Sequence, residues 1–197
     1  ALNNGYQYEN LTENKFQVAY LQTIGTYGKW DASKFYGDFG LYAQTGEAAV
    51  TNDKVDVGAY YAGFNLGYKF TAPFKAELGF EYLSGKDQND TDTKVKSFTP
   101  LFGTNHGFNG LMDYFYVGNH KNSVGLQDVY TKFIYDKNKW QVTLSPHLFY
   151  SAASVYNMTT LEEQDNYLGT EIDLTATYKL DKNFVISGGV SKMFASD

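Results

Sequence analysis

The charged residues of this 197-residue chain recur at alternate positions, a spacing that places them on one side of an extended strand. Lys75, Glu77 and Glu81 stand in the run Phe74-Lys75-Ala76-Glu77-Leu78-Gly79-Phe80-Glu81-Tyr82, in which every even position is apolar or aromatic. Fixed charges along one face of a wall bias the movement of ions beside it. This pattern indicates ion selectivity or salt bridging rather than catalysis.

Twelve charged residues share the polar phase of the expected strands. They are Lys34, Asp38, Lys69, Lys75, Glu77, Glu81, Asp128, Lys132, Asp136, Glu171, Asp173 and Lys179. The lysines lie close to short turns, and all the carboxylates except Asp136 lie in the middle of strands or closer to long connections. We therefore expect these residues to line a pore that is more acidic at one end and more basic at the other. A network of salt bridges that stiffens the wall is the alternative, and the two roles are compatible.

Other reactive groups form no recognisable motif. His106, His120 and His147 are far apart and make no HxxxH pair, so no metal site is predicted. The absence of cysteine excludes disulfides, thiol nucleophiles and cysteine-based zinc sites. No GxSxG motif is present, so we expect no enzyme activity and no cofactor. The acidic segment 87–92 suggests Ca²⁺, but it lacks the glycine and the closing glutamate of an EF-hand loop, which favours a solvated loop.

Composition limits the class of protein. Aromatic residues make up 18% of the chain, which argues against disorder, and the net charge of −6 gives no footprint for nucleic acid. Mean hydropathy is −0.43, and no apolar run approaches the ~20 residues of a membrane-spanning helix. Period-two alternation predicts about eight strands and no helix. The expected strands cover 16–27, 32–45, 60–70, 74–82, 125–136, 140–150, 168–180 and 184–194.

The lengths of the strands and connections favour an all-β fold, a transmembrane antiparallel β-barrel. The strands are longer than the ~5–6 residues usual in soluble sheets. Tight turns at 28–31, 71–73, 136–139 and 180–183 alternate with long loops near 46–54, 85–124 and 152–166. A soluble β-sandwich is the alternative, because half-buried strands also alternate. Six aromatic residues flank the tight turns as an interfacial girdle would: Trp30, Phe70, Phe74, Trp140, Tyr178 and Phe184.

The order of tight turns and long loops indicates whether this chain forms a whole barrel or a segment of one. An intact bacterial barrel starts and ends in the periplasm, so its outermost hairpins carry long loops. Here the first and last expected hairpins both close with tight turns. We therefore expect residues 1–197 to be a single segment of a larger, roughly 16–18-stranded barrel. A complete eight-stranded barrel with inverted topology is the alternative.

The most distinctive sequence segment lies in the long loop, where residues 98–119 read FTPLFGTNHGFNGLMDYFYVGN. The next expected strand opens with GLQDVY at residues 125–130. This stretch resembles the alginate-export-like outer-membrane porins of Bacteroidetes. The resemblance implies a bacterial outer-membrane barrel of about twice this length, of which this chain is the C-terminal half. The chain contains no arginine, although a conduit for an acidic polysaccharide would be expected to use it, so the family name does not define the solute.

We therefore expect a porin in the lipid bilayer that passes small hydrophilic or oligosaccharide solutes by diffusion. The aromatic loop, residues 99–118, is expected to fold inward and narrow the pore, with His106 and Asp113 as constriction residues. Packing that seals the barrel rim is the alternative for this loop. The alternative for the whole protein is a structural barrel with an occluded lumen that binds other envelope proteins.

Overall fold

The computed structural model describes residues 4–10, 15–50, 53–101 and 106–196. Its nine strands form one antiparallel sheet in chain order, so every strand pairs with its sequence neighbours. The strands are β1 (Asn4–Asn10), β2 (Lys15–Ala32), β3 (Phe35–Val50), β4 (Asp53–Thr71), β5 (Phe74–Leu83), β6 (Leu126–Lys137), β7 (Trp140–Tyr150), β8 (Tyr167–Lys179) and β9 (Val185–Ala195). A single 3₁₀ turn, η1 (Val117–Asn119), interrupts the long loop of the described chain.

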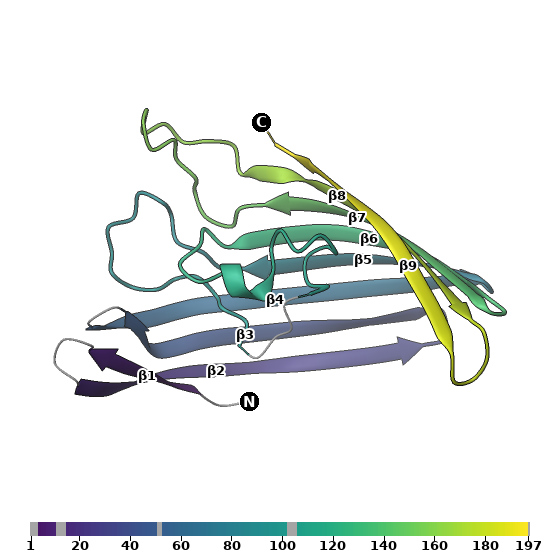
Figure 1. Cartoon of the computed structure of the whole chain (residues 1–197), viewed down its shortest axis with the longest axis horizontal. Helices are drawn as coiled ribbons and strands as arrows, with labels where there is room; N and C mark the ends of the chain where they lie inside the picture. Colours follow the sequence, from purple (N-terminus) through teal and green to yellow (C-terminus); the bar gives the residue numbers. More distant parts are fainter. Residues whose placement is uncertain (1–3, 11–14, 51–52, 102–105, 197) are drawn as a thin grey trace.

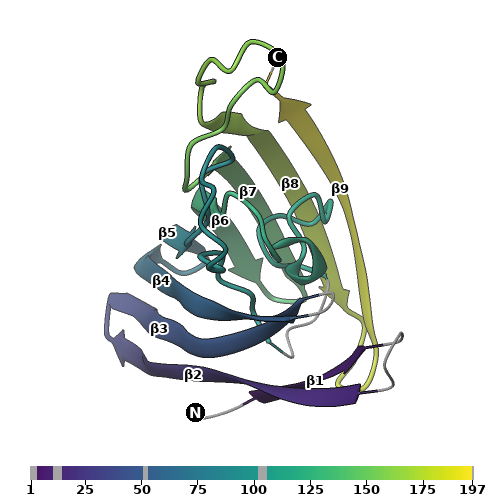
Figure 2. The same cartoon turned by 90° about the vertical axis from the view of Figure 1, so that its left-hand side faces the viewer.

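The sheet is a curved wall. The strands run along the long axis of the molecule, with tight turns at the right-hand end and longer loops at the left (Figure 1). Seen from the loop end, the sheet forms an open arc, and part of the segment between β5 and β6 lies inside it (Figure 2). Within the described residues no pairing joins β1 to β9. Such an open antiparallel arc is consistent with part of a larger barrel.

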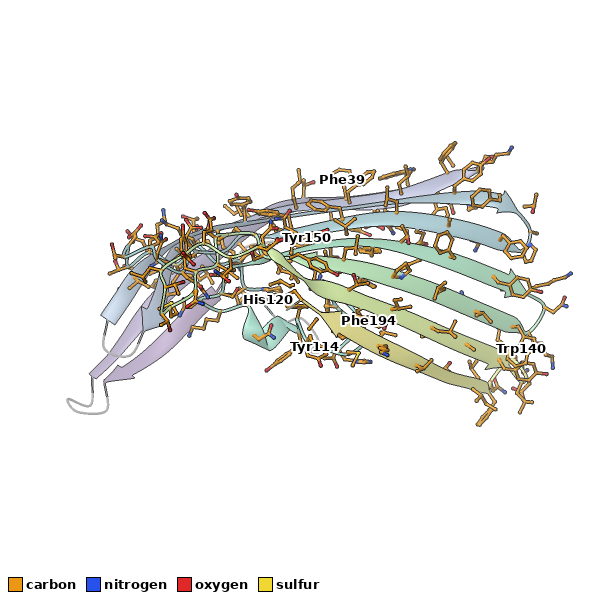
Figure 3. All side chains as sticks on the ribbon, turned by 90° about the horizontal axis from the view of Figure 1, so that it is seen from above. Phe39, Tyr114, His120, Trp140, Tyr150 and Phe194 are labelled. Carbon is orange, nitrogen blue, oxygen red and sulfur yellow. The ribbon has the colours of Figure 1, made fainter. Side chains whose placement is uncertain are left out.

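The convex face of the wall is apolar. Phe39 of β3 lies opposite Phe64 of β4, which lies opposite Phe80 of β5, and all three side chains are exposed. A second row, from Leu144 to Leu174, continues along the other half of the sheet. Figure 3 shows Phe39 projecting from the outer side. In the described structure no second sheet covers this face. This finding argues against a soluble β-sandwich, the alternative that the sequence left open.

Two boundaries differ from the sequence-based expectation. The loop expected near residues 46–54 is largely strand, because β3 extends to Val50 and β4 begins at Asp53. Cross-strand pairs hold this extension, with the Lys54 ammonium 2.8 Å from the Glu47 carboxylate. Apolar and polar residues alternate only weakly in this stretch. Its buried Val57 packs under the long loop. The loops expected at 85–124 and 152–166 are present.

The first tight turn also lies later than predicted. Gly28 and Asp31 suggest a turn, but both remain in β2, and the turn falls at Ser33 and Lys34. Gly28 serves the sheet instead, because the Phe39 ring lies where a side chain at this position would be. Lys34, expected on the inward face of a strand, therefore lies exposed in a turn.

Strand β1 is absent from the sequence-based prediction. It pairs with β2 from Asn4 opposite Leu21 to Asn10 opposite Lys15. The expected hairpin of strands 16–27 and 32–45 does close with a tight turn, at residues 33–34, but it is the second hairpin of the described chain and not the first. The segment 11–14, which joins β1 and β2, lies outside the described residues.

Aromatic side chains gather at the tight-turn end as predicted. Trp140 packs on Tyr178 with 4.7 Å between ring centroids, and Phe74 packs on Tyr135 at 5.2 Å. Figure 3 shows Trp140 at this end of the sheet. Phe70 and Phe184 are more than half exposed. The position is established, and an interfacial role for this aromatic set stays a prediction.

A small core forms where the long loop meets the wall. Phe98 of the loop is buried with Leu83, Leu126 and Phe149 from three strands. Val95 bonds the backbone of β4, where Gly58 N donates to the Val95 carbonyl at 2.9 Å and Val95 N donates to the Asp56 carbonyl at 2.8 Å. The described residues contain no helix long and apolar enough to cross a membrane. The core thus fixes the base of the loop rather than the interior of a globular domain.

Candidate functional site on the concave face

The long loop is held to the wall by side-chain carboxylates. Asn109, near the middle of the loop, directs its amide Nδ2 to Glu81 Oε2 at 3.0 Å and to Asp128 Oδ2 at 3.3 Å. Glu81 and Asp128 lie opposite one another on β5 and β6. One amide nitrogen therefore bridges two carboxylates of adjacent strands, where it offsets part of their mutual repulsion.

A second anchor lies on β8. The backbone N–H groups of Leu111 and Met112 donate to Glu171 Oε1 at 2.6 and 2.9 Å. Leu111 N is also 3.2 Å from Asp173 Oδ2. Glu171 and Asp173 are fully or almost fully buried beneath the loop. Consecutive backbone amides aimed at one carboxylate form an anion-binding nest. Their hydrogen bonds offset part of the desolvation free energy of the buried Glu171 carboxylate.

The local sequence explains how the loop reaches this geometry. Asn109 has φ +48° and Gly110 has φ +88°, both in the left-handed region that asparagine and glycine adopt most readily. A Cβ atom on Gly110 would lie 2.6 Å from Glu171 Oε1. The Asn-Gly pair therefore both turns the chain and lets its backbone approach the carboxylate.

His147 of β7 connects the two anchors. Its Nδ1 lies 3.0 Å from both oxygens of Asp128, and its Nε2 lies 3.9 Å from Asp173 Oδ2. The ring stacks on Tyr130 with 5.2 Å between centroids. The sequence places His147 on the inward face without a role, and the structure makes it the link between Asp128 and Asp173.

We call the group formed by Glu81, Asp128, His147, Glu171 and Asp173 the acidic anchor. Inside it, Glu171 Oε2 and Asp173 Oδ1 have no hydrogen-bond partner among the described residues. Four of its members were expected to line a pore, and the structure places them beneath the loop. They hold the loop in place, a role that the sequence did not indicate because the partners are up to 62 residues apart.

The expected constriction residues contact each other. His106 Nδ1 lies 2.7 Å from Asp113 Oδ2, and Gly107 N donates to Asp113 Oδ1 at 3.3 Å. These contacts close residues 106–113 into a compact turn. His106 is largely exposed, and the segment lies on the concave side of the sheet. Phe102, another aromatic residue of this loop, lies outside the described residues. A narrowing role for His106 and Asp113 stays a prediction.

The other members of the inward set lie toward the tight turns. Lys69 and Lys75 are cross-strand neighbours on β4 and β5. Glu77 accepts a hydrogen bond from the Tyr36 hydroxyl at 2.9 Å and lies opposite Lys132. Lys179 ends β8 and is exposed. The carboxylates of the acidic anchor thus lie nearer the long loops than these lysines, in the order expected from the sequence.

The acidic segment 87–92 is neutralised by lysines. Lys96 Nζ lies 2.6 Å from Asp90 Oδ2 and 3.4 Å from Asp92 Oδ2, and Lys86 contacts the Asp92 carbonyl. The hydrogen bond from Lys96 lowers the pKa of Asp90. Across the described chain no group of three His, Asp or Glu residues could hold a metal ion. Lys96 thus pairs with two of the carboxylates that suggested Ca²⁺ from the sequence.

His120 belongs to the long loop and lies on the side of the site that the loop forms. Its ring is buried, and burial lowers the pKa of the imidazole while a hydrogen bond to the backbone of Phe115 partly offsets that shift. Its Nε2 has no partner among the described residues. Figure 3 places His120 and Tyr114 on the inner side of the sheet. Sequence reasoning assigned neither a position nor a function to this histidine.

The fold and the site together define the class of protein. A curved antiparallel sheet with an apolar outer face, a charged inner face and a loop folded inward is consistent with part of a larger β-barrel. The sequence profile of the alginate export family matches residues 7–197, and the chain belongs to this family. Membership indicates an export or porin-type protein of the outer membrane. A comparison with curated proteins gave no significant match.

Proposed function

We propose that the protein is an outer-membrane channel for passive diffusion of small hydrophilic or oligosaccharide solutes, narrowed by its long loop. The observation that carries this proposal is the docking of residues 109–112 onto the acidic anchor. A loop held by four carboxylates on the inner wall occupies lumen space at a fixed depth. Such a loop sets the size of the solutes that pass.

The two faces of the sheet support a membrane location. The exposed convex rows of Phe39, Phe64 and Phe80 suit lipid, and the concave face carries the carboxylates and lysines. Burying an outward apolar band in hydrocarbon recovers about 25 cal/mol per Å² of apolar area. A water-filled space on the inner side keeps the charged groups hydrated.

The charges support preference for cations over anions. Among the inward residues, Asp38 and Glu77 make no hydrogen bond or ion pair to the described residues of the loop. Fixed carboxylates raise the local concentration of cations in a narrow aqueous pore. The expected result of Asp38→Asn with Glu77→Gln is a reversal potential closer to zero in a salt gradient. An unchanged reversal potential shows that these two residues do not line the conducting path.

Single-channel recording in planar bilayers tests the proposal. The full-length protein is purified in detergent, and its folded state is checked by its heat-dependent mobility on a gel. Discrete conductance steps that shrink when oligosaccharides of increasing size are added support a diffusion channel. A silent bilayer with a folded barrel contradicts it.

A second candidate is a structural barrel with an occluded lumen that binds another envelope protein. One feature of the loop supports this candidate, namely three large apolar side chains that face solvent. Met112, Tyr114 and Tyr116 are 39%, 55% and 38% exposed. Exposed aromatic residues on a loop are common at protein interfaces. This candidate predicts no conductance, and a partner that copurifies with wild type but not with Tyr114→Ser plus Tyr116→Ser.

A further inference from the structure

A cavity of about 460 Å³ lies between the loop and the wall formed by β2 to β6. Its walls carry aromatic rings, including Tyr42, Tyr61 and Tyr130 from the strands and Phe98 from the loop. Gly79 makes room for one of them, because the Tyr130 ring covers the position of its missing side chain. A concave site of this size with aromatic walls is typical of a small-molecule pocket.

Besides hydroxyl groups, which can donate or accept, the cavity carries three acceptor groups that have no partner in the described structure. Asp38 lines it, and in the described structure no hydrogen bond or ion pair reaches its carboxylate. Asn65, opposite Asp38 in the sheet, has a buried side-chain oxygen with no donor. His120 adds a buried Nε2 with no partner. Because the His120 ring donates to the Phe115 backbone through its other nitrogen, Nε2 of the neutral ring accepts hydrogen bonds.

Other polar side chains of the cavity are already engaged. Gln44 bonds the backbone of Thr99 with both ends of its amide, at 2.7 and 3.0 Å. Asn109 is committed to Glu81 and Asp128. The unpartnered acceptors of Asp38, Asn65 and His120 thus favour a ligand that brings donors, which the hydroxyl groups of the cavity can also accept.

Charge narrows the ligand class further. Asp38 and Glu81 both line the cavity. Two lysines stand beside these residues, namely Lys132, which lies over the Tyr130 ring at 5.0 Å, and Lys29, opposite Asp38 in the sheet. Neither forms an ion pair with Asp38 in the described structure. An ammonium ligand gains from carboxylates and from the faces of aromatic rings, whereas a carboxylate ligand is repelled.

We propose that this cavity is a binding site for a small organic cation, a protonated amine on a body the size of a sugar ring. The ammonium group bonds Asp38, with Asn65 and His120 Nε2 as further acceptors, and the rings of Tyr61 and Tyr130 cover its body. The proposal rests on the proposed function only in that the solute reaches the cavity through the lumen. It assigns a positively charged solute to a site within a family named for export of a polyanion.

Calorimetry on the full-length protein in detergent tests the proposal with three probes that share one ring. These probes are glucosamine, which is cationic, glucose, which is neutral, and glucuronate, which is anionic. Glucosamine is expected to bind at least about tenfold more tightly than glucose, because a charge-assisted hydrogen bond is stronger than a neutral one. Added NaCl should weaken this difference.

Two variants locate the binding. Asp38→Asn should reduce glucosamine affinity about tenfold and leave glucose affinity unchanged. Asp136→Asn makes the same change of charge near the tight turn between β6 and β7, away from the cavity, and should not alter affinity. Equal binding of the three probes, preferred binding of glucuronate, no binding of glucosamine, or equal loss in both variants would each overturn the proposal.

The test separates this proposal from the channel function. Binding of glucosamine by a protein that gives no conductance supports the cation site and contradicts the channel. Conductance without glucosamine binding supports the channel and contradicts the cation site.

Discussion

At the scale of single residues, Glu171 shows how the site combines predictable and unpredictable features. Alternation along β8 assigns Glu171 and Asp173 to the inward face, and the structure places both there. Their partners could not be predicted, because Leu111 and Met112 use backbone N–H groups, which carry no signal in the residue type. The Asn109-Gly110 pair was a usable signal, since Asn-Gly favours a left-handed turn.

The contact between Gly110 and Glu171 gives a residue-scale prediction. Gly110→Ala should release the loop, because the left-handed backbone costs about 1–2 kcal/mol for alanine and the new Cβ meets the Glu171 carboxylate. Gly107→Ala is the matched control, with φ +78° and no atom within 4 Å of its Cβ. Limited proteolysis should cut the loop faster in Gly110→Ala than in Gly107→Ala. Equal rates would show that the Glu171 contact does not hold the loop.

His120 gives a prediction on pH. Burial holds its pKa below the usual value of 6.5, so the docked loop binds fewer protons than a released loop. Docking is therefore fully stable above pH 6.5 and weakens as the pH falls through the lowered pKa of the folded state.

Hydrogen exchange of residues 107–120 measures this effect. Exchange, corrected for its intrinsic pH dependence, should report weaker protection at about pH 5.5 than at about pH 7.5. His120→Asn should reduce that pH dependence, and the remainder belongs to the acidic anchor. An identical pH response in both proteins would contradict a role for His120.

At the scale of elements, the sequence predicted strands well where alternation was clean. Strands β5 to β9 lie close to their expected ranges, because each carries an apolar and a polar phase. The extension of β3 and β4 was missed because Glu47, Asp53 and Asp56 are typical of loops. What keeps these residues in strands is tertiary, namely the Lys54–Glu47 ion pair and the packing of Val57 beneath the loop.

The base of the loop gives the element-scale prediction. Phe98 is 6% exposed and lies 5.6 Å from the Tyr61 ring, so Phe98→Ala should cost about 3–5 kcal/mol of local stability. Phe108 belongs to the same loop but is 41% exposed, and Phe108→Ala should cost much less. Hydrogen exchange of residues 95–98 compares the two. Similar protection in both variants would mean that Phe98 does not fasten the loop.

At the scale of the whole molecule, the membrane location depends on the difference between the two faces. Leu174 is exposed on the convex face between Leu144 and Val190, and the next residue, Thr175, belongs to the concave face. Leu174→Lys should hinder folding into lipid vesicles by about 2–4 kcal/mol, the cost of a cation near the bilayer centre. Thr175→Lys should fold nearly as wild type.

The readout for this pair is the heat-dependent gel mobility of the folded barrel after mixing with vesicles. Equal folding yields for Leu174→Lys and Thr175→Lys would contradict a lipid-facing convex surface. The sequence predicted this two-faced wall correctly because period two is a property of the strand itself. Local alternation carries no signal for the number of strands in a whole barrel.

The most direct test of the loop-narrowed channel is the single-channel conductance of the full-length protein with and without its acidic anchor. Glu171→Ala combined with Asp173→Ala removes the acceptors of the loop amides, and Asp136→Ala removes a carboxylate of the same face that makes no loop contact. Proteolysis establishes that the loop is released. The loop-narrowed channel predicts a larger conductance step for the double variant and an unchanged step for Asp136→Ala. An unchanged step with a released loop would contradict it.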